Sequence, residues 1–166
     1  MSPPFIRPAL LDDLPAIVAI YNEAIEQRFA TADLRPVSVE QRRQWFAEHD
    51  PSAYPIYVSE ADGEVLGWCS LSAYRAGREA VLRTAEISYY VARASRRRGI
   101  GRTLVEHAVF EAPRLGKRVL FAILLEKNEP SIRLMERCGF ERWGRLPDVA
   151  EIDGELVSHV YYGRRA

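Results

Sequence analysis

Hydrophobic residues recur along the chain with two different periods. Helical spacing marks two long segments, over residues 14–25 and 100–112. Shorter runs have the length and the bounding turn residues of strands, and they cover residues 5–8, 56–60, 65–73, 81–91, 118–125, 140–146 and 156–162. Hairpins followed by strand, helix, strand, helix and strand predict a mixed sheet with helices on its faces, which is the three-layer α/β class.

Capping and turn signals place the ends of further elements. Asp12 and Asp13 are available to cap the first helix, and Ser38 with Gln41 three residues later predicts the start of a second one. A short helix is predicted over residues 128–137. Two Asp-Gly pairs, which are strong hairpin signals, stand at residues 62–63 and 153–154.

The composition narrows the class of protein. The 166 residues are most simply one domain, residues 1–166, with 48% hydrophobic and 28% charged residues. Lys+Arg and Asp+Glu are both 23, so the zero net charge argues against a general nucleic-acid surface. No apolar run approaches the ~20 residues needed to span a membrane. Cys69 and Cys138 give neither zinc spacing nor a disulfide framework, so we expect no metal and a cytoplasmic location.

The most informative segment is the Arg-Arg-Arg-Gly-Ile-Gly run at residues 96–101. It follows a predicted strand and opens the helix that begins at Ile100. Glycines let the backbone turn sharply there and bring several N–H groups close to one ligand. The helix start adds further unpaired N–H groups and the positive end of the helix dipole. With arginines beside it, the junction predicts a phosphate or pyrophosphate site.

Three stretches resemble one family. Arg96-x-x-Gly99-x-Gly101 is similar to the Gln/Arg-x-x-Gly-x-Gly/Ala signature of the GNAT superfamily of acetyl-CoA-dependent N-acetyltransferases. Asn128-x-x-Ser131, closing at residues 139–140 in Gly-Phe, resembles the segment that follows in that superfamily. The strand over residues 84–91 resembles that of phosphinothricin and methionine sulfoximine acetyltransferases. The resemblance implies a GNAT-type fold, with a sheet of about seven strands and helices on both faces.

The resemblance also implies a cofactor site and a reaction. Acetyl-CoA would be the co-substrate, and its acetyl group would pass directly to the primary amine of a small amino acid or analogue in a ternary complex. Asn128 would contact the pantetheine arm, although its simpler role is that of a helix cap, and part of the arginine run could be a solvated surface. The cofactor-binding residues implied are Tyr89, Tyr90, Val91, Arg96, Arg97, Arg98, Gly99, Ile100, Gly101, Arg102, Asn128 and Ser131.

Glu86 is the candidate catalytic residue. Strand alternation puts it on one face with Thr84, Ser88 and Tyr90, and a glutamate among polar neighbours is usually just solvated. The matching residue of phosphinothricin-type enzymes is a general base, which would remove the proton of the attacking ammonium. Partial burial would raise the Glu86 pKa toward the useful range.

Two departures from the family pattern concern the rest of the chemistry. Met135 stands where many members carry the tyrosine, and phosphinothricin-type relatives the histidine, that protonates the leaving thiolate. The chain could therefore be an acetyl-CoA-binding sensor or partner-binding protein with little catalysis. A Rossmann dinucleotide site is a poorer match, because Leu104 stands where a third glycine is needed.

The acceptor side rests on fewer signals. Val81 stands where relatives tend to show tyrosine. A homodimer is expected by resemblance, with the aromatic strand over residues 157–162 as a contributor. Loop arginines that could pair with a carboxylate, together with neighbouring side chains, form the predicted acceptor site: Phe29, Thr31, Tyr74, Arg75 and Arg78.

Overall fold

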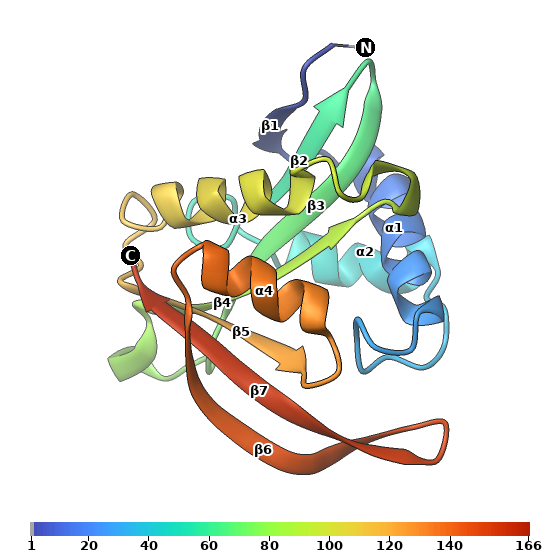
Figure 1. The fold of residues 1–166 in the computed structure, drawn as a ribbon. Coiled ribbons are helices and arrows are strands. Elements are labelled where there is room, and N and C mark those ends of the chain that lie inside the picture. The colour runs from blue at the N-terminus through green and yellow to red at the C-terminus, as the bar shows by residue number, and fades with distance from the viewer. Residues whose placement is uncertain (1) are drawn as a thin grey trace.

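The chain forms one mixed sheet of seven strands with the order β1-β2-β3-β4-β5-β7-β6 (Figure 1). A computed structural model describes residues 2–166. The strands are β1 Phe5–Pro8, β2 Ile56–Ala61, β3 Glu64–Ala73, β4 Thr84–Val91, β5 Val119–Leu125, β6 Glu141–Ile152 and β7 Glu155–Arg165. The helices are α1 Leu14–Glu26, α2 Val39–Ala47, α3 Ile100–Glu111 and α4 Glu129–Arg137, and 3-10 turns cover Leu11–Asp13, Glu79–Val81 and Arg93–Ser95.

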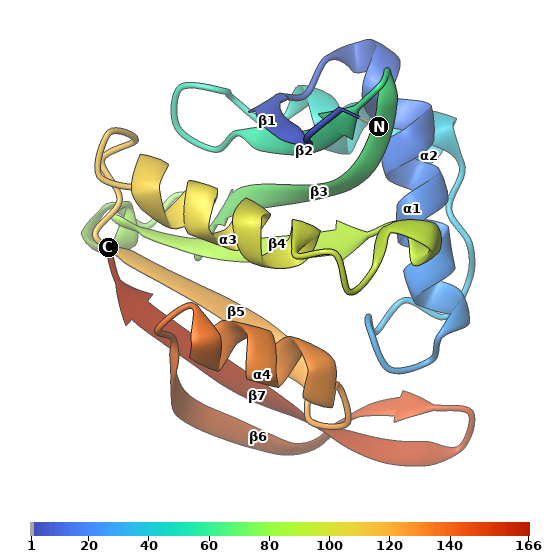
Figure 2. The same cartoon turned by 45° about the horizontal axis from the view of Figure 1, so that its top comes forward.

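Two helix pairs cover opposite faces of the sheet, which confirms the predicted three-layer class (Figure 2). On one face, α3 buries Leu104 and Val105 against the sheet, and Met135 of α4 joins the same core. On the other face, α1 and α2 pack on a smaller core that contains Ile17 and Trp68. No helix in the described part of the chain is long and apolar enough to cross a membrane.

The predicted caps form in one case and not in the other. Ser38 accepts a hydrogen bond from the Gln41 N–H at 3.1 Å, and the Gln41 side chain accepts from the Ser38 N–H at 2.8 Å, so the capping box of α2 is confirmed. Asp13 does not cap α1. Its carboxylate accepts from the Leu10 N–H at 2.7 Å and pairs with Arg7 at 2.7 Å, because a 3-10 turn precedes the helix.

The hairpin turns follow the predicted Asp-Gly pairs. Asp62 and Gly63 have φ of 51° and 80°, and Asp153 and Gly154 have φ of 51° and 82°. Positive φ at both central residues is the requirement of the tight hairpin turn whose twist matches that of the strands. The strand predicted over residues 81–91 starts only at Thr84, because residues 79–81 form a 3-10 turn.

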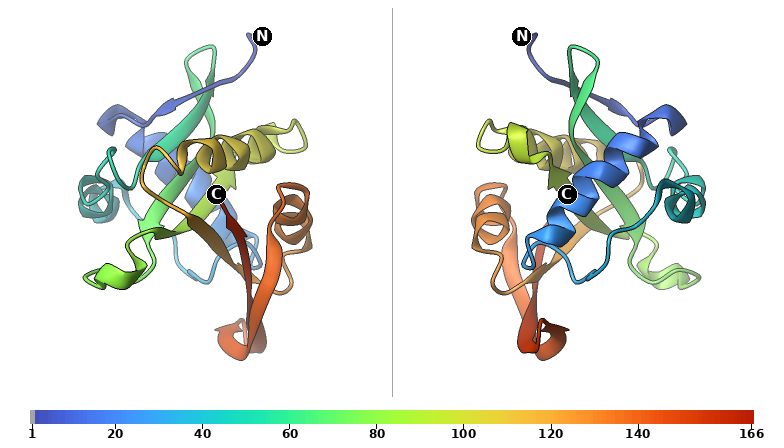
Figure 3. Two further views of the ribbon diagram at one scale, coloured as in Figure 1. Left: turned by 90° about the vertical axis from the view of Figure 1, so that its left-hand side faces the viewer. Right: turned by 90° about the vertical axis from the view of Figure 1, so that its right-hand side faces the viewer.

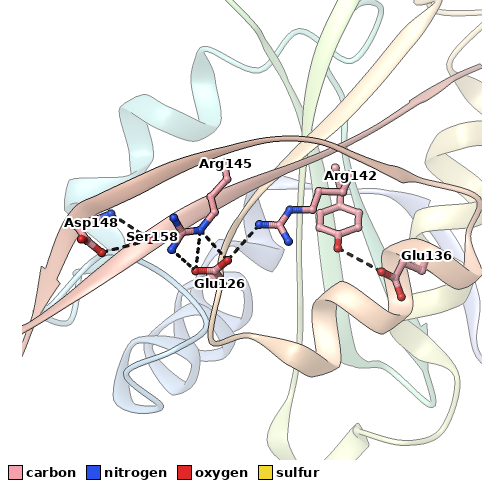
Figure 4. Close-up of polar contacts among 7 residues, drawn as sticks. Glu126, Glu136, Arg142, Arg145, Asp148 and Ser158 are labelled. Carbon is pink, nitrogen blue, oxygen red and sulfur yellow. Dashed lines mark hydrogen bonds and ion pairs between the residues drawn. The ribbon is translucent and has the colours of Figure 1, made fainter.

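The last two strands form a long hairpin whose order in the sheet differs from the expectation. We expected the strand over residues 157–162 to be exposed, yet β7 pairs with β5 on one side and β6 on the other. The exposed edge is therefore β6, and the hairpin projects away from the helices (Figure 3). Arg145 binds Glu126, which follows β5, at 2.8 Å, and Arg142 approaches the same carboxylate at 3.1 Å (Figure 4). These pairs fix β6 beside the loop that leads into α4.

Candidate active site

The pairing of β4 with β5 is short, and this opens the sheet. The two strands are parallel and pair only between Thr84–Glu86 and residues 119–121. Beyond Glu86 they diverge toward the end at which α3 and α4 begin (Figure 2). The β5-facing backbone of residues 87–91 is therefore free of ladder partners, and buried backbone groups of this kind need a partner from elsewhere.

A cavity of about 830 Å³ lies at this opening. Its walls come from the end of α1, from β4, from the first turn of α3 and from α4. The structure brings twelve of the predicted site residues together around it: Phe29, Tyr89, Tyr90, Val91, Arg96, Arg97, Gly99, Ile100, Gly101, Arg102, Asn128 and Ser131.

The other predicted residues lie outside the cavity wall. Glu86 lies three residues before Tyr89 on β4, beside the cavity. Arg75 and Arg78 are exposed in the connection between β3 and β4. The remaining residues that do not line it are Thr31, Tyr74 and Arg98. The Thr31 hydroxyl lies 3.0 Å from the Tyr21 hydroxyl, which binds Thr31 into the segment after α1.

Sequence reasoning missed several wall residues. The signal for Arg133 and Arg137 was available, because two cations four residues apart lie on one face of a helix. Ser95 comes from a 3-10 turn that the pattern did not predict. The others carry no chemical signal that singles them out: Ala24, Gln27, Ala30, Glu129, Pro130 and Leu134.

The start of α3 has the backbone shape of an anion site. Gly99 is the N-cap with φ of 83°, and Arg97 also has a positive φ, 60°. The first intrahelical bond comes from the Thr103 N–H to the Gly99 carbonyl, 3.0 Å, so the N–H groups of residues 100–102 precede the helical ladder. Those donors, the helix dipole and the arginine side chains all favour a bound anion.

Gly101 has a different role from Gly99. A Cβ added at Gly101 would lie 3.0 Å from Leu134 Cδ1 and 3.4 Å from Tyr89 Cε2, whereas one at Gly99 would meet nothing within 4 Å. Gly101 therefore allows α3, α4 and β4 to approach one another closely. Gly99 provides the left-handed backbone, which a β-branched residue adopts only with strain.

Asn128 and Ser131 line the cavity from the first turn of α4. The Asn128 Oδ1 accepts from the Ser131 N–H at 3.3 Å, so the expectation that Asn128 caps the helix is confirmed. The Tyr89 hydroxyl donates to Ser131 Oγ at 2.7 Å, and burial raises the pKa of Tyr89 to about 12. Tyr89 thus stays protonated and joins β4 to α4 across the cavity wall.

Glu86 is a partly buried carboxylate without a compensating cation. Burial raises its pKa, and across residues 2–166 it takes part in no ion pair. A carboxylate with a raised pKa binds a proton more readily than one on the surface, and this suits a general base. The expected partial burial is thus present.

Met135 and the two cysteines belong to the core. Met135 and Cys69 are fully buried and Cys138 is 4% exposed. Burial raises the pKa of Cys69 to about 12 and also raises that of Cys138, so neither thiol favours the thiolate that acts as a nucleophile. No group of three or more His, Cys, Asp or Glu side chains in residues 2–166 is arranged to hold a metal ion.

Comparisons with known proteins identify relatives over nearly the whole chain. The model of the acetyltransferase (GNAT) family matches residues 16–140. YwnH of Bacillus subtilis (strain 168), provisionally named a phosphinothricin acetyltransferase, is 43% identical over 92% of this chain and 93% of its own. An L-methionine sulfoximine/L-methionine sulfone acetyltransferase of Pseudomonas aeruginosa is 38% identical over 94% of this chain and 91% of its own.

A solved structure adds a ligand to the comparison. The crystal structure of a GNAT superfamily phosphinothricin acetyltransferase from Sinorhizobium meliloti, in complex with AcCoA, superposes with a TM-score of 0.91. It is 28% identical, and the match covers 98% of this chain and 88% of that one.

The burial of Glu86 generates a prediction about stability. Its pKa is higher in the folded than in the unfolded chain, so its ionised form destabilises the fold at every pH above the folded pKa. Glu86→Gln should therefore raise the melting temperature at pH 7 to 8. The gain should shrink as the pH falls through the folded pKa and disappear below the unfolded value of about 4.3. Calorimetry from pH 3 to 8 measures this, and a gain independent of pH would contradict it.

Proposed function

The chain belongs to the acetyltransferase (GNAT) family, and from this premise we propose that it transfers the acetyl group of acetyl-CoA to the α-amine of a small amino acid or close analogue. The observation that carries the proposal is the meeting of two features at β4. An anion-binding helix start and an open strand edge line one cavity, and a partly buried carboxylate lies three residues further up the same strand.

The cavity residues fit the two polar parts of acetyl-CoA. The N–H groups of residues 97–102 would hold the pyrophosphate, and the arginine side chains beside them would neutralise its charge. The free edge of residues 89–91 would pair with the pantetheine amides as an added strand would. One N–H of this edge would donate to the thioester oxygen, an interaction typically worth ~3 kcal/mol in the transition state.

Glu86 would remove the proton of the acceptor ammonium as the amine attacks the thioester carbon. The carbon–sulfur bond then breaks and the sulfur leaves as a thiolate. Met135 is buried and cannot donate a proton, so water or the product ammonium would protonate the thiolate. Direct attack in a ternary complex is supported by the two buried cysteines, whose raised pKa values disfavour an acetyl-enzyme.

The acceptor class is supported by charge and by the relatives. Arg75 and Arg78 are exposed in the connection between β3 and β4, where they could pair with a carboxylate. Glu86 and one of these arginines would then hold the two ends of an α-amino acid. Phe29, on the cavity wall, would face its side chain. Relatives named for methionine sulfoximine and phosphinothricin act on molecules of this kind.

The first prediction tests the reaction itself. With acetyl-CoA, a thiol-release assay over amino acids, polyamines, peptides and aminoglycosides should give the highest kcat/KM for an amino acid or analogue. Arg75→Ala should raise the acceptor KM, while Glu86→Gln should lower kcat by about 100-fold or more, because one binds and the other moves a proton. Arg43→Ala, an exposed arginine on α2, is the control.

Two results of this assay would contradict the proposal in different ways. Preference for an acceptor without a carboxylate would reject the acceptor class and leave the acetyltransfer intact. Binding of acetyl-CoA without thiol release for any amine would instead favour the sensor that Met135 keeps open.

The second prediction tests the helix start. Gly99→Val has room for its side chain but forces a β-branched residue to φ of 83°. The strain should displace the donors and weaken acetyl-CoA binding by about tenfold or more, as expected for roughly 1–3 kcal/mol. Gly99→Asn, which tolerates positive φ, should retain most of the affinity. Calorimetric titration measures both, and equal dissociation constants for Gly99→Val and the unmodified protein would refute the assignment.

The third prediction concerns a homodimer formed through the β6–β7 hairpin. β6 is an unpaired sheet edge, and large apolar side chains are exposed along the hairpin: Trp143, Leu146, Val149 and Leu156. Such an edge favours pairing with a second chain. Light scattering should give twice the chain mass, and Leu156→Lys should shift the protein toward the monomer. A monomer at all working concentrations of the unmodified protein would refute the dimer.

A further inference from the structure

A group of small polar side chains lies beneath α2, on the sheet face that otherwise carries the smaller hydrophobic core. Ser70 and Ser72 of β3 stand directly opposite Ser88 and Glu86 of β4. Paired residues of antiparallel strands point to the same face, with Cβ atoms about 4.5–5.5 Å apart. Ser72 is therefore the nearest cross-strand neighbour of Glu86, and a hydroxyl there is within reach of its carboxyl group.

His49, just after α2, contacts this group from above. Its ring stacks on Trp45 with centroids 4.7 Å apart. The Nδ1 atom lies 2.7 Å from the Trp45 carbonyl oxygen, and the Nε2 atom lies 3.3 Å from Ser72 Oγ. His49 therefore connects the end of α2 to the strand that faces Glu86.

The partners of His49 determine its tautomer. A carbonyl oxygen only accepts, so the hydrogen-bond network assigns the proton to Nδ1, which donates to Trp45. Burial lowers the pKa of His49 against the opposing effect of Glu48, and this favours the neutral ring. Nε2 is then a bare acceptor, and the Ser72 hydroxyl must donate to it.

This bond fixes what Ser72 presents to Glu86. A serine hydroxyl has one hydrogen, and with that hydrogen directed to His49 only lone pairs remain for Glu86. Lone pairs accept a hydrogen bond from a protonated carboxyl group and repel a carboxylate. The arrangement therefore favours Glu86 after it has taken up a proton.

We propose that His49 is a positioning residue: through Ser72 it stabilises the protonated form that Glu86 adopts during acetyl transfer. The inference rests on the role of Glu86 in the proposed function. One proton leaves the acceptor ammonium and binds Glu86, whose new O–H donates to Ser72 Oγ while Ser72 continues to donate to His49. The proton returns to water after the product leaves, and His49 stays neutral throughout.

A protonated His49 would reverse the effect. Its Nε2–H would donate to Ser72, and the Ser72 hydrogen would turn toward Glu86 and stabilise the carboxylate. The charged groups concerned are Glu48 beside His49 and Glu86 itself, whose raised pKa has burial as its cause. His49 thus controls the basicity of a residue that it does not contact.

The test compares Ser72→Ala and His49→Leu with His49→Gln, which keeps an acceptor close to the position of Nε2. The carboxyl carbon of Glu86 is titrated by ¹³C NMR, assigned by its loss in Glu86→Gln, and the acidic limb of kcat/KM is measured in parallel. In the first two variants both midpoints should move to lower pH by roughly half to one unit, the effect of one lost hydrogen bond to the neutral acid. His49→Gln should stay near the unmodified protein.

His107→Leu is the matched control. This histidine also stacks on an aromatic ring, Tyr57 at 4.6 Å, but it lies on α3. It should leave the titration of Glu86 unchanged. An unmoved Glu86 midpoint in Ser72→Ala and His49→Leu overturns the proposal, whatever happens to turnover or melting temperature. An equal shift in His49→Gln and His49→Leu overturns the acceptor role of Nε2. The NMR titration decides even if no amine is acetylated, so a failure of the proposed function remains distinguishable.

Discussion

Parallel pairing of β4 with β5 covers three residues on each strand, and the geometry of the site follows from where it stops. Over the same length, β4 stays paired with β3 from Ala85 to Val91, so only one of its edges opens. The opening therefore has a rigid wall, because the free backbone groups are held in place by the ladder behind them. A ligand that pairs with this edge would complete the sheet locally and would pay little to order the protein.

The close contact between Gly101 and Leu134 completes this constraint. It brings the starts of α3 and α4 together at the point where the strands separate. Both helices therefore direct their unpaired N–H groups toward the same cavity, and Asn128 satisfies one of those of α4. The glycine motif has two separate physical functions here. Gly99 sets the direction of the chain, and Gly101 sets the distance between two helices.

Local signals predicted the elements well. The boundaries of α3 and the capping box at Ser38 follow from a helical period and a cap, which depend on residues close in sequence. The family resemblance then supplied the fold and grouped most of the cavity residues. The 3-10 turns and the length of the β6–β7 hairpin were not predicted, because short turns and strand ends depend on packing with distant segments. The interior place of β7 was missed for the same reason.

The environment of Glu86 shows the same limit more sharply. Its position on the strand followed from alternation, and its burial was expected. The bond from His49 to Ser72 was not foreseen, because it joins residues 23 positions apart through the packing of α2 on the sheet. A lone histidine at the end of a helix carries no sequence signal that tells which strand it will meet.

The place of β7 has a consequence for the order in which the molecule can assemble. β7 lies between β5 and β6, and β6 pairs with no other strand. During synthesis, β6 leaves the ribosome before the strand on which it rests. The apolar side chains of β6 and the ion pairs of Arg145 with Glu126 must then wait until residues 155–165 emerge. The sheet thus closes as one late step, and an unfinished chain exposes the edge of β5 to whatever binds nascent polypeptides.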